Sequence, residues 1–179
     1  MTDRNFALTP LGKPVIVFAI AVATLLPAAA AVYAVLQVQA GEVGVSALRL
    51  AQGQAMMALV ALTIVLPLWR RQAAFNGQRI RVRATWFGRE SPVSDFLLDQ
   101  ARVVDLREHL EFKPRFKTMG YQLPGLWCGN FRLRDGRKAF CLVTDPARVL
   151  VLPHADGRVW LLSLQHPQPV LDILRRTRG

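Results

Sequence analysis

Two long apolar segments constrain this chain more than any other feature of its sequence. Residues 55–69 contain no charged side chain, and together with residues 50–54 they reach the roughly 20 residues with which an α-helix crosses ~30 Å of hydrocarbon. Upstream, Pro14–Val38 runs for 25 residues without a charge. The sequence therefore predicts two transmembrane helices, at residues 14–38 and 50–69.

The distribution of Lys and Arg around these segments predicts their orientation. Residues 1–13 carry two such cations, residues 39–49 carry one, and residues 70–83 carry five. Because cationic flanks are retained in the cytoplasm, we expect residues 1–13 and 70–179 on the cytoplasmic side of a bacterial inner membrane and residues 39–49 outside. The alternative is a signal peptide cleaved near Ala40, although the apolar run is longer than the about 7–15 residues of such leaders.

The formal charge of +11 is concentrated after the second apolar segment, where 20 Lys and Arg accompany 10 Asp and Glu. A basic domain beside a membrane is attracted to anionic lipid head groups by about 1 kcal/mol per cation near the surface. Alternatively, the charge serves only topology and solubility. A membrane-tethered domain is not expected to bind nucleic acid, the other polyanion. Cys128 and Cys141 form no CxxC pair and are expected to be reduced, ordinary sheet residues.

After Trp69 the pattern changes to a period of two, which indicates β-strands. Residues 79–86 alternate polar and apolar side chains and predict a strand that places Trp86 in the core. Further expected elements are a turn at 88–92, short strands at 93–97 and 102–106, and an edge strand or loop at Lys113–Lys117, where a proline interrupts the pattern.

Two Asp-Gly pairs, Asp135-Gly136 and Asp156-Gly157, each lie between alternating runs and predict β-hairpins. If the first pair alone forms the turn, Phe131 lies opposite Phe140 on a core face. Two successive hairpins predict an antiparallel meander. A closing helix is expected from His166-Pro167, because an apolar stripe at helical spacing follows and the last turn is basic.

Several of these segments resemble the bacterial PH domain family. The resemblance covers roughly residues 75–176 and is carried by Arg115-Phe116-Lys117-Thr118-Met119-Gly120, Leu123-Pro124-Gly125, Gly129-Asn130-Phe131, Asp135-Gly136, Val143-Thr144-Asp145 and Arg148-Val149-Leu150-Val151-Leu152. It implies that a two-helix transmembrane hairpin is followed by an all-β PH-like barrel of about seven antiparallel strands, capped by a C-terminal α-helix. The family has no agreed ligand or catalytic residues, so the resemblance implies no site.

The sequence lacks the motifs of common catalytic and cofactor sites. The three histidines are widely spaced, without HExxH or a Cys/His cluster, and neither GxGxxG, a P-loop nor a nucleophile elbow is present. Gly120, Gly125 and Gly129 are interpreted as marking turns or a bulge rather than a phosphate cradle. We therefore expect no enzymatic activity and no catalytic, cofactor-binding or metal-binding residues.

Cationic clusters are the candidate binding sites. Lys113, Arg115 and Lys117 recur at period two, so an extended segment points all three one way toward phosphate oxygens, unless they only protect an exposed strand edge. The complete set of candidate anion or lipid contacts is Arg70, Arg71, Arg79, Lys113, Arg115, Lys117, Arg132, Arg134, Arg137 and Lys138.

The resulting expectation is a membrane-anchored PH-like module that binds or scaffolds at the cytoplasmic face of the inner membrane. Its partners would be anionic lipid head groups, a membrane protein, or a second copy of the chain, since small residues such as Ala28–Ala31 permit close helix approach. The alternative is a protein-interaction module that accepts a strand at an exposed sheet edge, as a subunit of a membrane complex.

Overall fold

The computed structural model describes residues 4–39, 47–84 and 86–178. The chain divides into two compact units, one made of Ile16–Trp69 and one made of Met1–Val15 together with Arg70–Gly179. Most of the predicted external loop, residues 40–46, lies outside the described residues, and so does the alternative cleavage site at Ala40.

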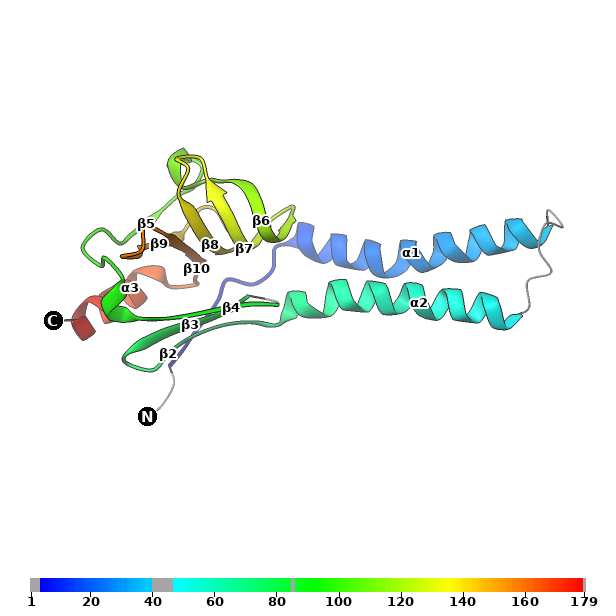
Figure 1. Cartoon of the computed structure of the whole chain (residues 1–179), viewed down its shortest axis with the longest axis horizontal. Helices are drawn as coiled ribbons and strands as arrows, with labels where there is room; N and C mark the ends of the chain where they lie inside the picture. The colour runs from blue at the N-terminus through cyan, green and yellow to red at the C-terminus, as the bar shows by residue number, and fades with distance from the viewer. Residues whose placement is uncertain (1–3, 40–46, 85, 179) are drawn as a thin grey trace. The chain divides into compact units, whose positions relative to one another are not determined.

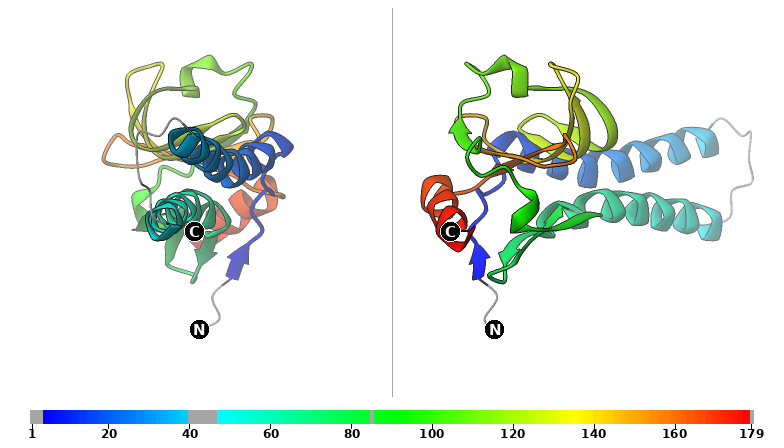
Figure 2. Two further views of the ribbon diagram at one scale, coloured as in Figure 1. Left: turned by 90° about the vertical axis from the view of Figure 1, so that its right-hand side faces the viewer. Right: turned by 60° about the vertical axis from the view of Figure 1, so that its left-hand side comes forward.

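The helical unit is built from α1 (Lys13–Gln39), α2 (Ala47–Val65) and the 3-10 turn η1 (Leu66–Trp69). The two long helices run antiparallel and side by side (Figure 1 and Figure 2). Ala19 and Ala61 are buried, and the side-chain amide of Gln54 bonds to α1, donating to Pro27 O at 3.1 Å and accepting from the N–H of Ala31 at 2.9 Å. Small side chains and one polar bridge therefore join the helices, as is common between helices in membranes.

Large apolar side chains of these helices remain exposed, which is unusual for a helix pair in water. Leu25, Tyr33 and Leu59 are each at least 60% exposed. Among the described residues one helix segment, Lys13–Gln37, is long and apolar enough to cross a membrane. The second predicted span, residues 50–69, falls on α2 and η1 and stays a prediction.

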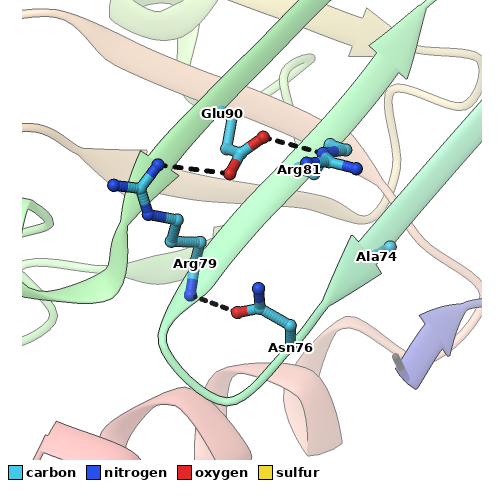
Figure 3. A pocket seen from close by; sticks show the side chains of 5 residues that line it. All are labelled: Ala74, Asn76, Arg79, Arg81 and Glu90. Carbon is cyan, nitrogen blue, oxygen red and sulfur yellow. Dashed lines mark hydrogen bonds and ion pairs between the residues drawn. The ribbon is translucent and has the colours of Figure 1, made fainter. Parts of the chain in front are cut away.

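The second unit begins with a four-stranded antiparallel sheet in the order β1-β2-β3-β4. Its strands are β1 (Arg4–Phe6), β2 (Arg71–Phe75), β3 (Arg79–Ala84) and β4 (Phe87–Pro92). The predicted alternation of β3 is confirmed, because Ile80 and Val82 are buried and the arginines between them are exposed. Asn76 closes the β2–β3 turn by accepting hydrogen bonds from the N–H groups of Gln78 and Arg79 at 3.1 and 2.8 Å (Figure 3).

Three local predictions near β4 are wrong. Residues 88–92 belong to β4 rather than to a turn, and Val93–Asp95 forms a 3-10 turn, η2, rather than a strand. Trp86 lies between β3 and β4 and is 64% exposed rather than in the core. The reason is common to all three: the chain reverses after Ala84, earlier than the alternating pattern suggests.

A six-stranded sheet follows, in the order β5-β9-β10-β8-β7-β6. Its strands are β5 (Arg102–Val104), β6 (Pro114–Leu123), β7 (Leu126–Leu133), β8 (Lys138–Val143), β9 (Val149–Pro153) and β10 (Val159–Ser163). A 3-10 turn, η3 (Leu110–Phe112), precedes β6, and helix α3 (Pro167–Arg178) closes the chain as predicted. Residues 114–117 of the segment Lys113–Lys117 belong to β6, which is an edge strand of this sheet.

The expected antiparallel meander is corrected by the position of β10. Both Asp-Gly hairpins form, but β10 lies between β9 and β8 and pairs with β8 in parallel. Every residue of β9 and β10 is buried, and such strands need covered faces and a neighbour on each side. A meander would have left β10 at an edge. The described strands form two sheets, one of which contains a parallel pair, so the all-antiparallel arrangement is wrong and the closed barrel stays a prediction.

The register of the β7–β8 hairpin also differs from the prediction by one residue. Phe131 pairs with Ala139 rather than Phe140, because the loop holds three residues, 134–136, closed by a bond between its flanking residues. Gly136 has φ of 89°, a left-handed conformation that glycine adopts without strain and that is typical of three-residue hairpin loops. The slip reverses which face each β8 side chain occupies.

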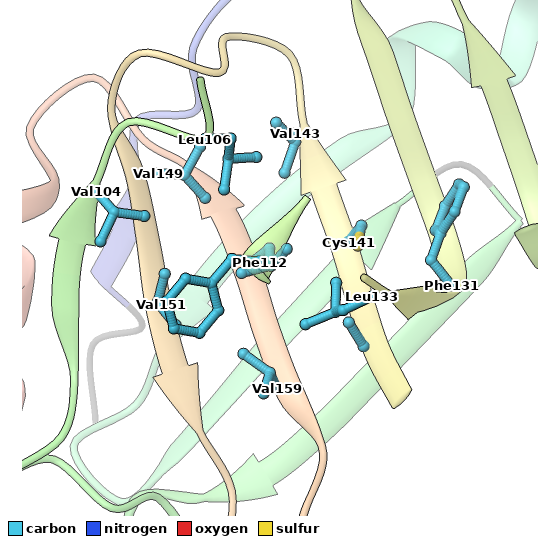
Figure 4. Close-up of a cluster of buried hydrophobic side chains, with 12 residues drawn as sticks. Val104, Leu106, Phe112, Phe131, Leu133, Cys141, Val143, Val149, Val151 and Val159 are labelled. Atoms are coloured by element: carbon cyan, nitrogen blue, oxygen red, sulfur yellow. The ribbon is translucent and has the colours of Figure 1, made fainter. Parts of the chain in front are cut away.

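The core face of the six-stranded sheet is shown in Figure 4. Its buried cluster combines one face of the central strands with Leu106 and Phe112 from the β5–β6 connection. Cys141 belongs to this cluster and Cys128 is also buried, and both are free thiols. Helix α3 contributes its own buried residues Leu171 and Leu174, so both faces of the sheet are covered.

The N-terminal segment completes this unit, although it precedes the helices in sequence. Strand β1 pairs with β2 over residues 4–6, and Phe6 stacks on Phe75 with ring centroids 6.0 Å apart. Further along, the N–H of Thr9 donates to Ser163 O at 3.2 Å, and Leu8 forms a bridge with Leu164. Residues on both sides of the helical unit therefore build one domain.

Candidate functional site

The ten cations predicted as anion contacts fall into several separate places. Arg70 is exposed just before β2. Arg71 is half-buried and its Nη1 donates to Thr9 O at 3.4 Å. Burial lowers the pKa of Arg71, with a smaller opposing effect of Cys128. Arg71 thus helps to hold the N-terminal segment against β2.

Arg79 lies beside a small pocket of about 70 Å³ that it shares with Ala74, Asn76, Arg81 and Glu90 (Figure 3). Arg79 Nη1 and Arg81 Nε lie 3.3 and 2.7 Å from the two carboxylate oxygens of Glu90. The hydrogen bond from Arg81 is the largest of the effects that lower the pKa of Glu90. Because this carboxylate already occupies both arginines, the pocket is a poor site for a second anion.

Strand β6 carries the period-two cluster but does not keep its alternation. Lys113, Arg115 and Lys117 are all exposed. The pairing with β7 is irregular before Phe116 and again after Lys117, so the regular extended geometry on which the prediction depends is interrupted. The Arg115 guanidinium lies 4.9 Å from the ring centroid of Phe116, a cation–π distance.

The two hairpin tips repeat one Asp-Gly-Arg arrangement. At the β7–β8 tip the N–H of Arg137 donates to Asp135 Oδ1 at 2.9 Å and its Nε donates to Oδ2 at 2.6 Å. At the β9–β10 tip the N–H of Arg158 donates to Asp156 Oδ1 at 2.9 Å, and the side chains pair at 3.3 Å. Arg134 is exposed at the first tip. Each Asp therefore both shapes its turn and pairs with the following Arg.

Arg132 and Lys138 meet at a pocket with a high concentration of positive charge. They are cross-strand partners on β7 and β8, and both line a cavity of about 240 Å³. Arg89 reaches the same cavity from β4, and Arg158 reaches it from the β9–β10 tip. Four cations from three parts of the chain therefore surround one opening.

Arg89 and Arg158 were not among the sequence-based candidates. Arg89 lies in the segment predicted as a turn, and no local pattern indicates that β4 places it beside β7. Arg158 carried a usable signal, because it follows Asp156-Gly157 as Arg137 follows Asp135-Gly136. Their proximity to Arg132 and Lys138 depends on how the two sheets pack.

A polar network of one buried, one half-buried and one exposed side chain has the bonding order of a catalytic triad. Ser91 Oγ lies 2.8 Å from His154 Nε2, and His154 Nδ1 lies 2.8 Å from Asp156 Oδ1. Ser91 is only 7% exposed and lines neither of the cavities described above. The His154 ring packs edge-on against Phe96 at 5.1 Å. Since Ser91 belongs to β4 and His154 follows β9, we interpret the network as a link between the two sheets.

Comparison with known proteins identifies the β-rich domain. No curated protein and no solved structure matches the chain. A family model described as bacterial PH domain matches residues 76–176. That range runs from the β2–β3 turn to α3 and includes all four cations of the 240 Å³ pocket. Because the match covers more than half of the sequence, the chain belongs to the bacterial PH domain family.

Proposed function

We propose that this protein is a PH-like binding or scaffolding module, anchored by two membrane crossings at the cytoplasmic face of the bacterial inner membrane and contacting anionic lipid head groups there. PH domains generally serve as binding modules rather than as enzymes. The anchoring half of the proposal rests on the helical unit, and the binding half rests on the excess of cations.

The observation that carries the anchoring is the pairing of β1 with β2, which joins Arg4 to Phe75 and Phe6 to Ala73. One strand precedes the apolar helices and the other follows them. A hydrogen-bonded sheet forms on one side of a bilayer, so the chain between β1 and β2 must cross an even number of times. If α1 crosses the membrane, α2 has to return, and this supports the two-span prediction.

The same pairing counts against removal of the first helix as a signal peptide. Cleavage near Ala40 would separate β1 from the domain, leave β2 as an open edge and remove the Phe6–Phe75 stack. Open, regular edges invite aggregation. The cytoplasmic orientation is supported by the five cations of residues 70–83 against one in the connecting segment.

Contact with anionic lipid is supported by exposed cations on the domain. Lys113, Lys117 and Arg134 are exposed, and in the described part of the chain none of them forms an ion pair. Each such cation near an anionic surface contributes about 1 kcal/mol. Tethering multiplies the effect, because a weak contact is strengthened when the anchor keeps the domain beside the membrane.

Binding of a protein partner by strand addition is the second candidate. Strand β6 is at the edge of the six-stranded sheet, and it exposes Phe116 and Met119, which are 58% and 59% accessible. The irregular pairing with β7 weakens this candidate, since bulges are a common means of preventing edge-to-edge association.

The topology is tested by single-cysteine labelling of the full-length protein in intact cells. The variants Asn5→Cys, Gly44→Cys and Arg176→Cys are treated with a membrane-impermeant maleimide. The wild-type protein, whose Cys128 and Cys141 are buried, gives the background labelling. We expect the position 44 cysteine to react in cells with a permeabilised outer membrane, and the other two only after lysis. Different accessibility of positions 5 and 176 would contradict the pairing of β1 with the rest of the domain.

The lipid contact is tested by hydrogen–deuterium exchange of the full-length protein in nanodiscs with and without phosphatidylglycerol. We expect slower exchange around Lys113–Lys117 and residues 132–138 in the anionic discs, and loss of the difference at high salt. A Lys117→Gln variant should reduce the protection, whereas Arg79→Gln, whose cation is paired with Glu90, should not. Identical exchange in both lipids would refute head-group contact.

A further inference from the structure

The pocket of about 240 Å³ is organised on one face of the β7–β8 hairpin. The pairs Asn130 with Phe140 and Arg132 with Lys138 are two residues apart along the ladder, so their side chains share this face. The opposite face carries the buried cluster. A polar and cationic recess therefore lies on the other side of the same two strands from a packed core.

Arg132 and Lys138 are placed directly opposite each other. Like charges at such positions destabilise a sheet. In the described part of the chain neither residue has a carboxylate partner. An anion bound in the recess would relieve this repulsion, so the Arg132–Lys138 pair indicates an anion-binding site.

Arg89 is fixed in position at the recess. Its Nη2 donates to Asn130 Oδ1 at 3.1 Å, and its guanidinium carbon lies 5.8 Å from the ring centroid of Phe140. Burial, followed by the charge of Arg158, lowers the pKa of Arg89, and Asp156 acts in the opposite direction. The planar fork is thus oriented by one amide and one ring while its remaining N–H groups stay available.

The charges at the recess do not balance. The carboxylate of Asp156 acts electrostatically on Arg89, but Asp156 already contacts both Arg158 and His154. Three cations, Arg89, Arg132 and Lys138, therefore have no carboxylate partner among the described residues. Arginine forks match phosphate oxygens in geometry, and a doubly charged phosphate balances more of this charge than a carboxylate does.

The size of the recess limits the ligand. Drug-sized ligands occupy cavities of about 300–1,000 Å³, so 240 Å³ suits a small anion and the few atoms attached to it. The Thr118 hydroxyl offers a further hydrogen bond, and the exposed side chain of Met119 offers an apolar wall for the attached carbons.

We propose that this recess binds the phosphate group of a small phosphomonoester, with Arg89 as the central contact and Arg132, Lys138 and Arg158 around it. Two sources share this chemistry: a lipid head group that ends in a phosphate, and a free phosphate compound. The lipid form rests on the proposed function, whereas binding of a free phosphate compound does not need the membrane.

The site is tested with full-length protein in zwitterionic nanodiscs, titrated calorimetrically with inorganic phosphate and with glycerol 3-phosphate. We expect saturable binding of one ligand per chain. Arg89→Gln should weaken it tenfold or more, as expected from the loss of a hydrogen bond to a charged group. Arg89→Lys keeps the positive charge but not the planar guanidinium, so its affinity should lie between those of wild type and Arg89→Gln.

The matched control is Arg107→Gln, which removes the same charge from an exposed position outside the pocket and outside the proposed lipid contacts. We expect it to change the affinity less than twofold. Unaltered thermal unfolding of each variant shows that the domain is intact. Absence of saturable binding, or equal weakening by Arg89→Gln and Arg107→Gln, would refute a defined phosphate site.

The source of the phosphate is resolved by replacing part of the zwitterionic lipid with phosphatidic acid or, at matched charge, with phosphatidylglycerol. If the site takes a lipid phosphomonoester, phosphatidic acid should inhibit binding of glycerol 3-phosphate and phosphatidylglycerol should not. Equal binding in both discs assigns the site to a free compound. Much tighter binding of a phosphoserine peptide than of either small ligand would overturn the proposal in favour of a protein partner.

Discussion

Gly129→Ala tests a close approach between the backbones of β6 and β7. Gly120 on β6 and Gly129 on β7 are cross-strand partners with φ of 147° and 116°. A Cβ atom on Gly129 would overlap the carbonyl oxygen of Met119 and would lie 2.7 Å from the Cα of Gly120. Both neighbours are backbone atoms, so no side-chain rotation can relieve the overlap.

The expected cost has two parts. An unfavourable φ for a residue with Cβ costs about 1–3 kcal/mol, and overpacking against atoms that cannot move costs about 1–3 kcal/mol more. Taking the middle of each range, Gly129→Ala should destabilise the domain by about 4 kcal/mol. In a domain of this size ~1 kcal/mol lowers Tm by about 4 °C, so we expect a loss of roughly 15 °C.

Gly136→Ala is the matched control. Gly136 also has a positive φ, 89°, but no atom lies within 4 Å of the position of an added Cβ. Only the conformational cost remains, about 2 kcal/mol at the middle of the same range. Thermal unfolding of the full-length protein in detergent, followed by tryptophan fluorescence, measures both variants. A Tm loss for Gly129→Ala no larger than that for Gly136→Ala would refute the close approach of β6 and β7.

Three further measurements probe other parts of the domain. Ser163 is 1% exposed and accepts hydrogen bonds from the N–H groups of Thr144 and Asp145 at 3.2 and 3.3 Å. Ser163→Ala leaves both donors unpaired and should lower the free energy of unfolding, measured in urea, by about 3 kcal/mol. A cost near zero would show that water replaces the hydroxyl. Burial, with a smaller effect of Cys128, raises the pKa of the Cys141 thiol. The stability that this thiol contributes is therefore complete below the unfolded thiol pKa of about 8.5 and is lost as pH rises above that value. Cys141→Ala should lose less stability than wild type on alkaline titration, and parallel curves of stability against pH would contradict the assignment. Hydrogen bonds from arginines of β3 lower the pKa of Glu90. The stabilising effect of this carboxylate is therefore present above about pH 4.3 and is lost as pH falls through the folded pKa. The Tm values of wild type and Glu90→Gln should converge in acid, and a constant difference in Tm would show that the charge is not responsible.

Local patterns predicted the elements that local forces determine. The alternation of β3, both Asp-Gly hairpins and α3 follow from side-chain periodicity and turn chemistry. The register error at Phe131 came from choosing a two-residue turn, whereas Gly136 permits a three-residue loop that the letters Asp-Gly do not distinguish. A single residue of loop length is enough to exchange the two faces of a strand.

Long-range arrangements were beyond the local patterns. Strand β10 lies between β9 and β8 because strands buried on both faces occupy the centre of a sheet. Which strands take the central places depends on all the strands together, so a short stretch of sequence cannot predict it. The pocket lined by Arg89 was not predicted for the same reason, since Arg89 reaches Arg132 and Lys138 only after two sheets have packed. Strand β1 has only three residues in a polar segment and gives no periodic signal.

The place of β1 in the chain has a consequence for biosynthesis. Arg4–Phe6 leaves the ribosome before the helical unit, yet its partner β2 is made only after the entire helical unit. The four-stranded sheet therefore cannot be completed until the helical unit has been made, and under the proposed topology it forms only when both ends of that unit emerge into the same compartment. Under the same proposal, a chain inserted in any other way would keep an incomplete sheet, which cellular proteases would recognise as an unfolded segment.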